Sequence, residues 1–278
     1  MFLAALRDAI NLLATRPVLW LTGVACGLFC SLLALTAYFT GMFFATRFLI
    51  LILLAGVFLA GMHYMAIKGD NPSIVAAVRG GAAYYFRILT PALVITFAVM
   101  MVFLLLMLTL SIFGSQDTAV LSVISFGVIL PAVLLTFFAD CAAVFEEKKV
   151  FASIQRSVEV ATLNLFEVLL FYLTSFLLFC AVSFAFFVVW TAALADKLEP
   201  VTRFNETQFA AFTPTQLISL VGADGVLIGA VCVFLATTVL FPLLFTYKAC
   251  FFRIVSGTTI PIRQVTGEFD SKGRWYKY

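Results

Sequence analysis

Six long, charge-poor apolar stretches constrain this chain more than any other feature of its sequence. Between Pro17 and Tyr247 each stretch contains 20 residues or more, and charged or turn-forming residues separate them. A bilayer core about 30 Å thick is crossed by about 20 helical residues, because each residue adds about 1.5 Å. Hydrocarbon leaves exposed backbone groups without hydrogen bonds, so the segments that cross it are helices. The pattern therefore predicts an all-α integral membrane protein with six transmembrane helices.

The composition supports a membrane protein and narrows its partners. Apolar residues make up 64% of the chain and charged residues 11%, against about 45–50% and about 25% in soluble domains. We therefore expect the lipid bilayer to be the main partner, together with other membrane subunits or a second copy of the chain. The net charge of +3 is too small to indicate nucleic-acid binding.

Charged residues set the boundaries of the expected spans. The spans are 17–45, 48–67, 88–113, 119–140, 168–194 and 225–247. Arg47 marks a tight turn between the first two, and the six spans pair into three hairpins. Pro131 and Pro242 fall inside spans four and six, where we expect kinks. Residues 1–257 form the six-helix domain, and residues 258–278 form a basic and aromatic tail.

Lysine and arginine are distributed unevenly on the two sides of these spans. Of the 17 such residues, 14 fall on one side, and the other side holds Arg47, Lys197 and Arg203. Loops rich in Lys and Arg stay in the cytoplasm. We therefore expect a multi-pass protein of the cell membrane with both termini in the cytoplasm.

A short amphipathic segment precedes each hairpin, at residues 2–15, 71–86 and 150–165. Arg7, Arg79 and Arg156 occupy equivalent places in the three segments, 72 and 77 residues apart. One interpretation is a threefold repeat in which interfacial helices lie in the headgroup plane, with these arginines as anchors. The other is that any basic linker between spans is amphipathic. The sequence leaves both open.

Two further segments bear on packing. Gly23 and Gly27 form a pair of small residues four apart, which allows close helix contact within the bundle or between protomers. Thr213 to Val221 reads as a short amphipathic helix between spans five and six, with Thr213 and Gln216 as its capping residues.

Three segments of the chain resemble a known group of membrane proteins. They are Val144–Ser157 with Asn164, then Val78–Leu89, and the opening from Ala5 to Trp20. Over Met1 to about Gly257 the chain resembles a six-span prokaryotic, archaeal-type membrane protein family of unknown function. That group is similar to the membrane domain attached to some glycerophosphodiester phosphodiesterases. The resemblance implies a six-helix membrane module, and it implies no hydrolase activity because the chain carries no phosphodiesterase domain.

Ionisable residues in or beside the spans are the candidate functional residues, because charge at membrane depth is costly. Asp140 ends a charge-free run, and its structural alternative is an ion pair with Lys148, Lys149 or a nearby arginine. Glu167 begins span five, where a helix-end charge would also fit. His63 is the lone histidine, and a hydrogen-bonded structural role is its alternative. The sequence predicts no catalytic, cofactor-binding or metal-binding residues, since no three or four ligands converge.

The sequence thus favours a non-enzymatic scaffold or accessory subunit of a membrane assembly. The alternative is a transporter or channel for a lipid or small solute, supported by the repeat, the kinked spans and Asp140. An enzyme acting on lipids is a third class. The role of Asp140 separates the first two, because a transport site needs its charge and a scaffold needs only its contacts.

Overall fold

The computed structural model describes residues 1–40, 42–70, 73–112, 118–205, 212–258, 268–269 and 275–276. The fold is all-α apart from two short strands. The helices are α1 (Phe2–Thr15), α2 (Val18–Thr40), α3 (Met42–Lys68), α4 (Ile74–Ile112), α5 (Thr118–Thr136), α6 (Ala139–Phe145), α7 (Val150–Leu163), α8 (Leu165–Ala193), α9 (Ala195–Thr202) and α11 (Pro214–Thr258). In the tail, β1 (Glu268–Phe269) pairs antiparallel with β2 (Trp275–Tyr276).

Within the described residues, five stretches are long and apolar enough to cross a membrane. They are Val18–Thr36, Ile74–Leu110, Phe126–Phe145, Leu165–Ala193 and Gln216–Thr258, and Leu53–Lys68 in α3 is a shorter apolar stretch. These six segments correspond in order to the six predicted spans. The first turn differs from the prediction, because α2 ends at Thr40 and α3 begins at Met42. Arg47 therefore lies within α3, as a good helix former can.

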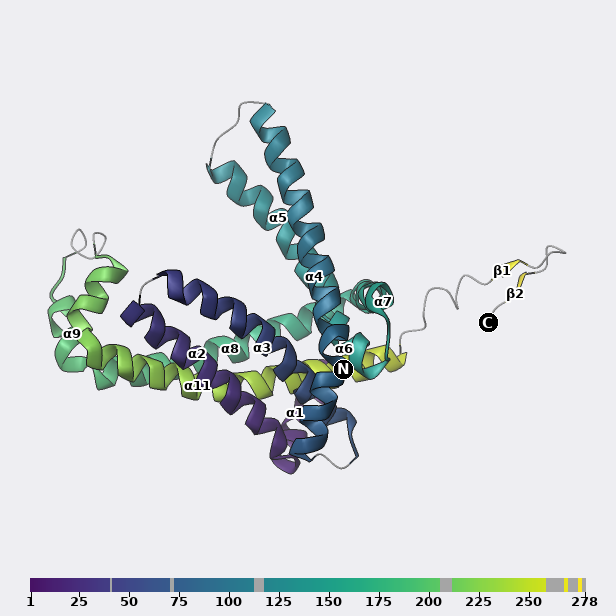
Figure 1. The fold of residues 1–278 in the computed structure, drawn as a ribbon, viewed down its shortest axis with the longest axis horizontal. Helices are drawn as coiled ribbons and strands as arrows, with labels where there is room; N and C mark the ends of the chain where they lie inside the picture. Colours follow the sequence, from purple (N-terminus) through teal and green to yellow (C-terminus); the bar gives the residue numbers. More distant parts are fainter. Residues whose placement is uncertain are drawn as a thin grey trace.

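The spans form two groups that share one base. Helices α2, α3, α8 and α11 extend together toward α9, whereas α4 and α5 leave the base in another direction as a separate hairpin (Figure 1). Helix α11 packs against α2, α8 and α1, and α3 packs against α2 and α4. The shared base lies where α1, α6 and α7 meet the long helices. Beyond the base, the α4–α5 hairpin stands apart from the other spans (Figure 1).

Glycines set the closest helix contact in the bundle. A Cβ on Gly23 would lie 2.5 Å from the carbonyl oxygen of Thr238 and 2.7 Å from Cδ of Pro242. A Cβ on Gly27 would lie 2.7 Å from the carbonyl oxygen of Phe234. Pro242 has no N–H, so it cannot donate to the Thr238 carbonyl within α11. The two glycines of α2 therefore serve packing against α11 inside the chain.

A second glycine contact joins α3 to α4. A Cβ on Gly81 would lie 3.0 Å from the backbone nitrogen of Met62, and one on Gly80 would lie 2.5 Å from the Met65 side chain. Gly61 of α3 meets the Gly81 carbonyl from the other side. Because this contact supports the helix at its glycines, residues 74–86 of the predicted segment do not form a separate helix, and residues 71 and 72 lie outside the described residues. Residues 74–86 are the first turns of α4.

The short helices α1 and α7 pack onto the base with different faces. In α1, Ala5, Ala9 and Leu13 are buried against the core, while Leu3 and Ile10 are exposed. In α7 the polar side points inward, and its buried residues include Ser153, Arg156, Ser157 and Glu159. The apolar residues Val160 and Ala161 are buried together with this polar side. The sequence does not reveal that the polar side faces the protein.

The core lies at the base and is rich in aromatic rings. Phe138, Phe171, Tyr247, Phe251 and Phe252 are all fully buried. The rings of Phe171 and Phe251 lie 4.7 Å apart between centroids, and those of Phe138 and Phe251 lie 5.7 Å apart. Pairs of this kind add stability beyond the area that they bury. The base therefore contains the buried aromatic core from which the spans extend.

Candidate functional site

Asp140 and Lys248 form an ion pair where the hairpin joins the bundle. Helix α5 ends at Thr136, and Asp140 lies in the first turn of α6. Its Oδ2 accepts a hydrogen bond from Lys248 Nζ at 2.7 Å and another from the Tyr64 hydroxyl at 2.9 Å. Its Oδ1 accepts the backbone N–H of Cys141 at 2.8 Å. The partner of Asp140 is thus on α11, and it is neither Lys148 nor Lys149.

The surroundings of this pair are apolar. Lys248 is 7% exposed, and its ammonium lies 3.9 Å from the centre of the Phe137 ring. The ring face attracts the cation. Separating two charges in such a place would leave each without compensation, so the pair is tied together by its own burial.

A cavity of about 420 Å³ opens beside Asp140, between the hairpin and the bundle. Its walls come from α3, α4, α5, α6 and α11, and they are apolar except for Thr136 and Asp140. Asp140 is therefore the charged group of this cavity. A ligand that used it would have to compete with Lys248 and Tyr64.

His63 bridges three helices inside the bundle. Its Nδ1 lies 2.7 Å from Thr22 Oγ1, and its Nε2 lies 2.8 Å from Thr246 Oγ1, and all three side chains are buried. Thr22 donates its hydroxyl proton to the Leu19 carbonyl at 2.6 Å, so it can only accept from His63. This assigns the proton to Nδ1 and leaves Nε2 to accept from Thr246. Both ring nitrogens are occupied within the chain.

Arg156 ties α7 to the ends of two other helices. Its Nε donates to Glu146 Oε1 at 3.0 Å, and its Nη2 donates to the Ser256 carbonyl at 3.0 Å. Its Nη1 lies 3.4 Å from Glu159 Oε2. Glu146 follows α6, and Ser256 lies in the last turn of α11. Carbonyls at a helix C-terminus lack intrahelical donors and carry partial negative charge, so a cation is stabilising there.

Two more cations at the base also donate hydrogen bonds to the carbonyl oxygens of other helices. Arg16 Nη1 donates to the carbonyls of Ala66, Ile67 and Gly69 at the end of α3, at 2.8, 3.0 and 2.9 Å. Lys68 Nζ donates to the carbonyl of Val144 in α6 at 3.0 Å.

Lys68 also pairs with a carboxylate outside the spans. Its Nζ lies 2.7 Å from Glu147 Oε1, which also accepts from the Tyr84 hydroxyl at 3.0 Å. These hydrogen bonds, that from Lys68 first, together with the positive charge of Lys68, hold the pKa of Glu147 below its ordinary value. The base thus uses several of its cations to hold helices together.

The remaining sequence-predicted residues lie apart from the Asp140 pair. Glu167 is in the first turn of α8, and its Oε2 lies 3.6 Å from the α-amino nitrogen of Met1. Arg7 and Arg79 are exposed, whereas Arg156 is 6% exposed. The three arginines of the proposed repeat therefore have different surroundings.

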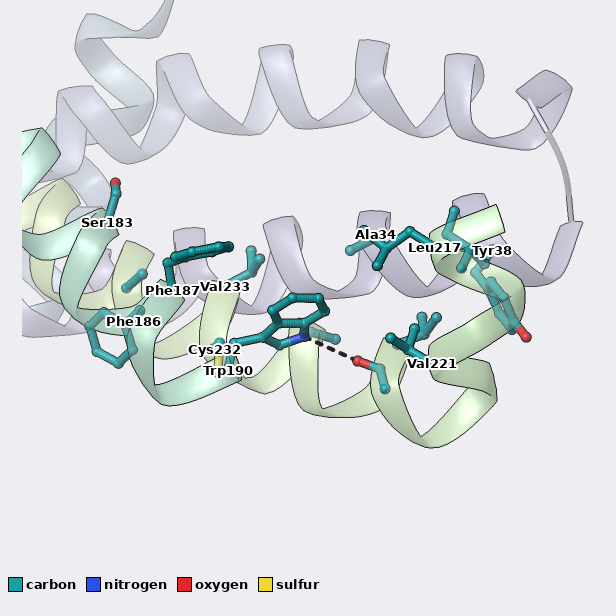
Figure 2. A pocket seen from close by; sticks show the side chains of 16 residues that line it. Ala34, Tyr38, Ser183, Phe186, Phe187, Trp190, Leu217, Val221, Cys232 and Val233 are labelled. Atoms are coloured by element: carbon teal, nitrogen blue, oxygen red, sulfur yellow. Dashed lines mark hydrogen bonds between the residues drawn. The ribbon is translucent and has the colours of Figure 1, made fainter. Parts of the chain in front are cut away.

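A second and larger cavity lies at the far end of the bundle, near α9. It has a volume of about 600 Å³ and is bounded by α2, α8 and α11. Figure 2 shows Trp190 in its centre, with Phe186 and Phe187 on the same helix and Leu217 and Val221 from α11. The indole Nε1 of Trp190 donates to the Gly225 carbonyl at 3.4 Å.

The described residues offer little reactive chemistry. They contain no group of three His, Cys, Asp or Glu side chains that could hold a metal ion. Asp140, Glu146 and Glu159 each contact a lysine or arginine, as described above. The arrangement can hold helices in register and can present apolar cavities, the two described above among them.

Several residues of these networks were not candidates from the sequence. Lys248 lies 108 residues from Asp140, and Thr246 lies 183 residues from His63. Tyr64 and Thr22 carry no charge and sit in apolar runs. The signal that could have found Lys248 is its position at the end of span six, since a lysine there requires a partner or a path to water.

Comparison with models of protein families matches residues 2–255 to one described as Domain of unknown function (DUF7847). Neither the curated proteins nor the solved structures contain a match to the chain. The ion pair, the histidine bridge and both cavities all lie within the matched residues.

Proposed function

The chain belongs to the DUF7847 family, an uncharacterised domain family, and from this premise we propose that it is a non-enzymatic scaffold or accessory subunit of a membrane assembly. In this proposal the α4–α5 hairpin binds a membrane-spanning helix of another subunit. The base holds the hairpin in place, and the protein carries out no reaction. Its place is the cell membrane, with both termini in the cytoplasm.

The observation that carries the proposal is the exposed hairpin. Its side chains beyond the base are large, apolar and exposed in the described chain, and they include Phe97, Leu104, Leu105, Leu108, Val123 and Phe126. Helices α4 and α5 extend away from the bundle that α2, α3, α8 and α11 form (Figure 1). Lipid can cover such a surface, but a partner helix packs it more closely. Because the α4–α5 hairpin is held apart from the other spans of its own chain, its exposed surface favours binding of a partner helix.

The ion pairs and hydrogen bonds inside the chain also support a structural role. The half-buried charge of Asp140 and the buried charges of Arg156 and Glu159 contact partners in the chain. A transported ion or solute needs groups that can exchange partners. Groups already tied to several neighbours are better suited to holding helices together.

The experiment uses photo-crosslinking from the hairpin in native membranes. A photoreactive residue at Phe97 or Leu104 should crosslink to one polypeptide that also co-purifies in a fixed stoichiometry in mild detergent. The matched control places the same group at Leu173 in α8, which is 55% exposed but not on the hairpin, and this should give lipid adducts. Recovery of lipid adducts alone from the hairpin would remove the scaffold proposal. Crosslinks to the same chain would identify a homo-oligomer as the assembly.

A matched pair of bulky variants tests whether the hairpin surface holds the partner. Leu104→Trp with Leu108→Trp should release the partner, because indoles prevent close helix contact yet remain compatible with lipid. Leu173→Trp with Leu177→Trp on α8 should leave the partner bound. Both pairs of positions are exposed and apolar, so a difference between them reports on the partner rather than on insertion.

One observation favours transport of a lipid or small solute as a second candidate. The 420 Å³ cavity lies between the hairpin and the bundle, and Asp140 lines it. In that case opening of the hairpin would expose Asp140 to a solute. Asp140→Asn would then abolish transport in reconstituted vesicles without lowering the melting temperature.

The resemblance to the membrane domain attached to glycerophosphodiester phosphodiesterases belongs to the same proposal. It would make this chain a membrane module that works beside a separate enzyme. A phosphodiesterase identified as the crosslinked partner would support this. The partner, in that case, carries the catalysis.

A further inference from the structure

The larger cavity near α9 differs from the Asp140 cavity in its walls. Of the side chains that line it, Tyr38, Ser183, Trp190 and Cys232 carry a heteroatom, and the others are hydrocarbon or glycine. The indole N–H of Trp190 is already bonded to the Gly225 carbonyl. A polar solute would therefore lose its hydration and gain few hydrogen bonds in return. The chemistry of the walls selects a hydrocarbon ligand.

The shape of the cavity follows from one stripe of α11. Gly225, Gly229, Cys232 and Ala236 recur at the spacing of one helix face, and all four line the cavity. From first to last they cover about 16 Å of helix. The small side chains of this stripe leave room for the Trp190 indole of α8, whose Nε1 would lie 3.3 Å from a Cβ on Gly229, and Figure 2 shows Trp190 in the cavity. A long, narrow wall of this kind fits an extended chain better than a compact molecule.

A turn in α11 closes one end of the cavity. Gly222 has a φ of 67°, a conformation that residues with a Cβ rarely adopt. The turn brings Leu217, Ile218 and Val221 of the preceding helical segment against the cavity. The capped helix expected before span six is therefore part of its wall. Thr213 and Gln216 cap its first turn as the sequence indicates, with Thr213 N–H donating to Gln216 Oε1 at 2.8 Å.

The closed end carries the ion pair of Lys197 and Asp224, and Glu199 of α9 forms a second ion pair with Arg203. Lys197 of α9 donates from Nζ to the Val221 carbonyl at 3.0 Å and to Asp224 Oδ2 at 3.1 Å. The side chains of Lys197 and Asp224 are 39% and 79% exposed, so both remain open to a further partner. A phosphate would complement Lys197, and an ammonium group would complement Asp224. A phospholipid whose headgroup carries both groups matches this pair and the hydrocarbon walls together.

From the cavity and the charge pair at its end, we propose that the space between α2, α8 and α11 binds one acyl chain of an ammonium-bearing phospholipid. The headgroup phosphate contacts Lys197, and the headgroup ammonium contacts Asp224. This site is separate from the hairpin surface and does not depend on a protein partner. It makes α9 and the preceding segment of α11 a headgroup clamp above a chain-binding groove.

The test counts retained lipids by native mass spectrometry. The full chain is reconstituted in vesicles of equimolar phosphatidylethanolamine and phosphatidylglycerol with identical chains, and is then extracted in mild detergent. We expect one phosphatidylethanolamine per protein to remain. Gly229→Leu places a side chain into the groove and should lower the lipid-bound fraction about tenfold. Gly127→Leu adds the same bulk on α5, where a Cβ meets no atom within 4 Å, and should leave the bound fraction unchanged.

Two further variants make the result decisive. A Cβ on Gly229 would lie 3.3 Å from Trp190 Nε1. If Gly229→Leu lowers the melting temperature for this reason, Ala34→Leu, which fills the groove from α2, replaces it as the test variant. Asp224→Asn should abolish the preference for phosphatidylethanolamine over phosphatidylglycerol, because the two headgroups share the phosphate and differ in the ammonium group. Equal retention by the wild type, Ala34→Leu and Gly127→Leu would mean that only bulk lipid is bound, and it would overturn the proposal. An unchanged lipid preference in Asp224→Asn would overturn the headgroup assignment.

Discussion

At the scale of residues, the charges inside this protein act as connectors between helices. Arg16 joins the start of α2 to the end of α3, and Arg156 joins α7 to the ends of α6 and α11. Asp140 and Lys248 join α6 to α11 across 108 residues of sequence. Each cation meets either a carboxylate or the carbonyls of a helix end, where negative partial charge accumulates. Three of the cations on the predicted cytoplasmic side, Arg16, Arg156 and Lys248, are thus also structural.

Removing the charge of Asp140 should destabilise the protein. In Asp140→Asn, Lys248 keeps its charge among aromatic rings and loses its counter-charge, at a cost on the order of 3 kcal/mol. We expect a fall of several degrees in the melting temperature in detergent. Any activity or partner binding should fall only in proportion to the folded protein that remains.

The control for this prediction removes the stranded cation as well. Asp140→Asn with Lys248→Met should recover most of the lost stability, because an unbranched apolar side chain can pack against Phe137. An Asp140→Asn protein with an unchanged melting temperature and no function would instead place Asp140 in a transport path. That result would favour the second candidate function.

The sequence could identify Asp140 and His63 as unusual residues but could not supply their surroundings. Their environments depend on α2, α3, α6 and α11 meeting at one place, and no local pattern encodes that meeting. For Arg156 the difference is larger. A basic residue on the polar side of an amphipathic segment fits an exposed anchor, yet it is buried because Glu146 and Glu159 neutralise it.

At the scale of helices, close contact depends on glycines. The sequence leaves open whether Gly23 and Gly27 serve a contact within one chain or between two. The structure places both against α11, at the carbonyls of Thr238 and Phe234. Similarly, Gly80 and Gly81 weaken an isolated helix, at about 1 kcal/mol each relative to alanine. Packing against α3 offsets this weakness and allows α4 to continue unbroken.

Adding a methyl group at the α2–α11 contact should therefore be costly. Gly23→Ala and Gly27→Ala each place a Cβ within 2.7 Å of a backbone oxygen, and the helices must separate at a cost of about 1–3 kcal/mol. Gly127→Ala in α5 is the matched control, because its Cβ meets nothing within 4 Å. It should be neutral or slightly stabilising. The melting temperatures of the three variants are compared in the same detergent. Equal melting temperatures would contradict the close α2–α11 contact.

The third amphipathic segment shows why helix faces are hard to orient from sequence. Sequence patterning suggests that Ser153 tolerates a charge, because it lies off the apolar side. In the structure Ser153 is fully buried and donates to the Val150 carbonyl at 2.8 Å, whereas Phe151 on the apolar side is 76% exposed. In a membrane, lipid can cover an apolar side and the protein can cover a polar one. The usual inference that apolar means inward is then reversed.

At the scale of the whole molecule, the number and order of the spans follow from the sequence, and their arrangement does not. Long apolar runs fix where helices cross a membrane, because length and hydropathy alone decide it. The departure of α4 and α5 from the bundle has no such signal, since their composition resembles that of α8. An exposed apolar hairpin can be told from a packed one only by its contacts.

The last prediction concerns the orientation of the molecule and follows from the distribution of the 17 lysines and arginines. In a cysteine-free background, a cysteine at Asn205, which is exposed after α9, should react with a membrane-impermeant thiol reagent in intact cells. A cysteine at Ser271, outside the described residues, should react only after lysis. The reason is that 14 of the 17 cations lie on the side of the tail, and such segments are retained in the cytoplasm.

The opposite labelling pattern would show that the protein has the inverted orientation, and each end of the molecule would then lie in the other leaflet. The groove near α9 would then take its lipid from the cytoplasmic leaflet, and the cation-rich base with Arg16, Lys68 and Arg156 would face outward. A base that faced outward would place its lysines and arginines on the side of the membrane that the positive-inside rule disfavours. Because the same cations cap helix ends and set orientation, we expect the base to lie in the cytoplasmic leaflet. The α9 end, with its lipid groove, then lies in the outer leaflet.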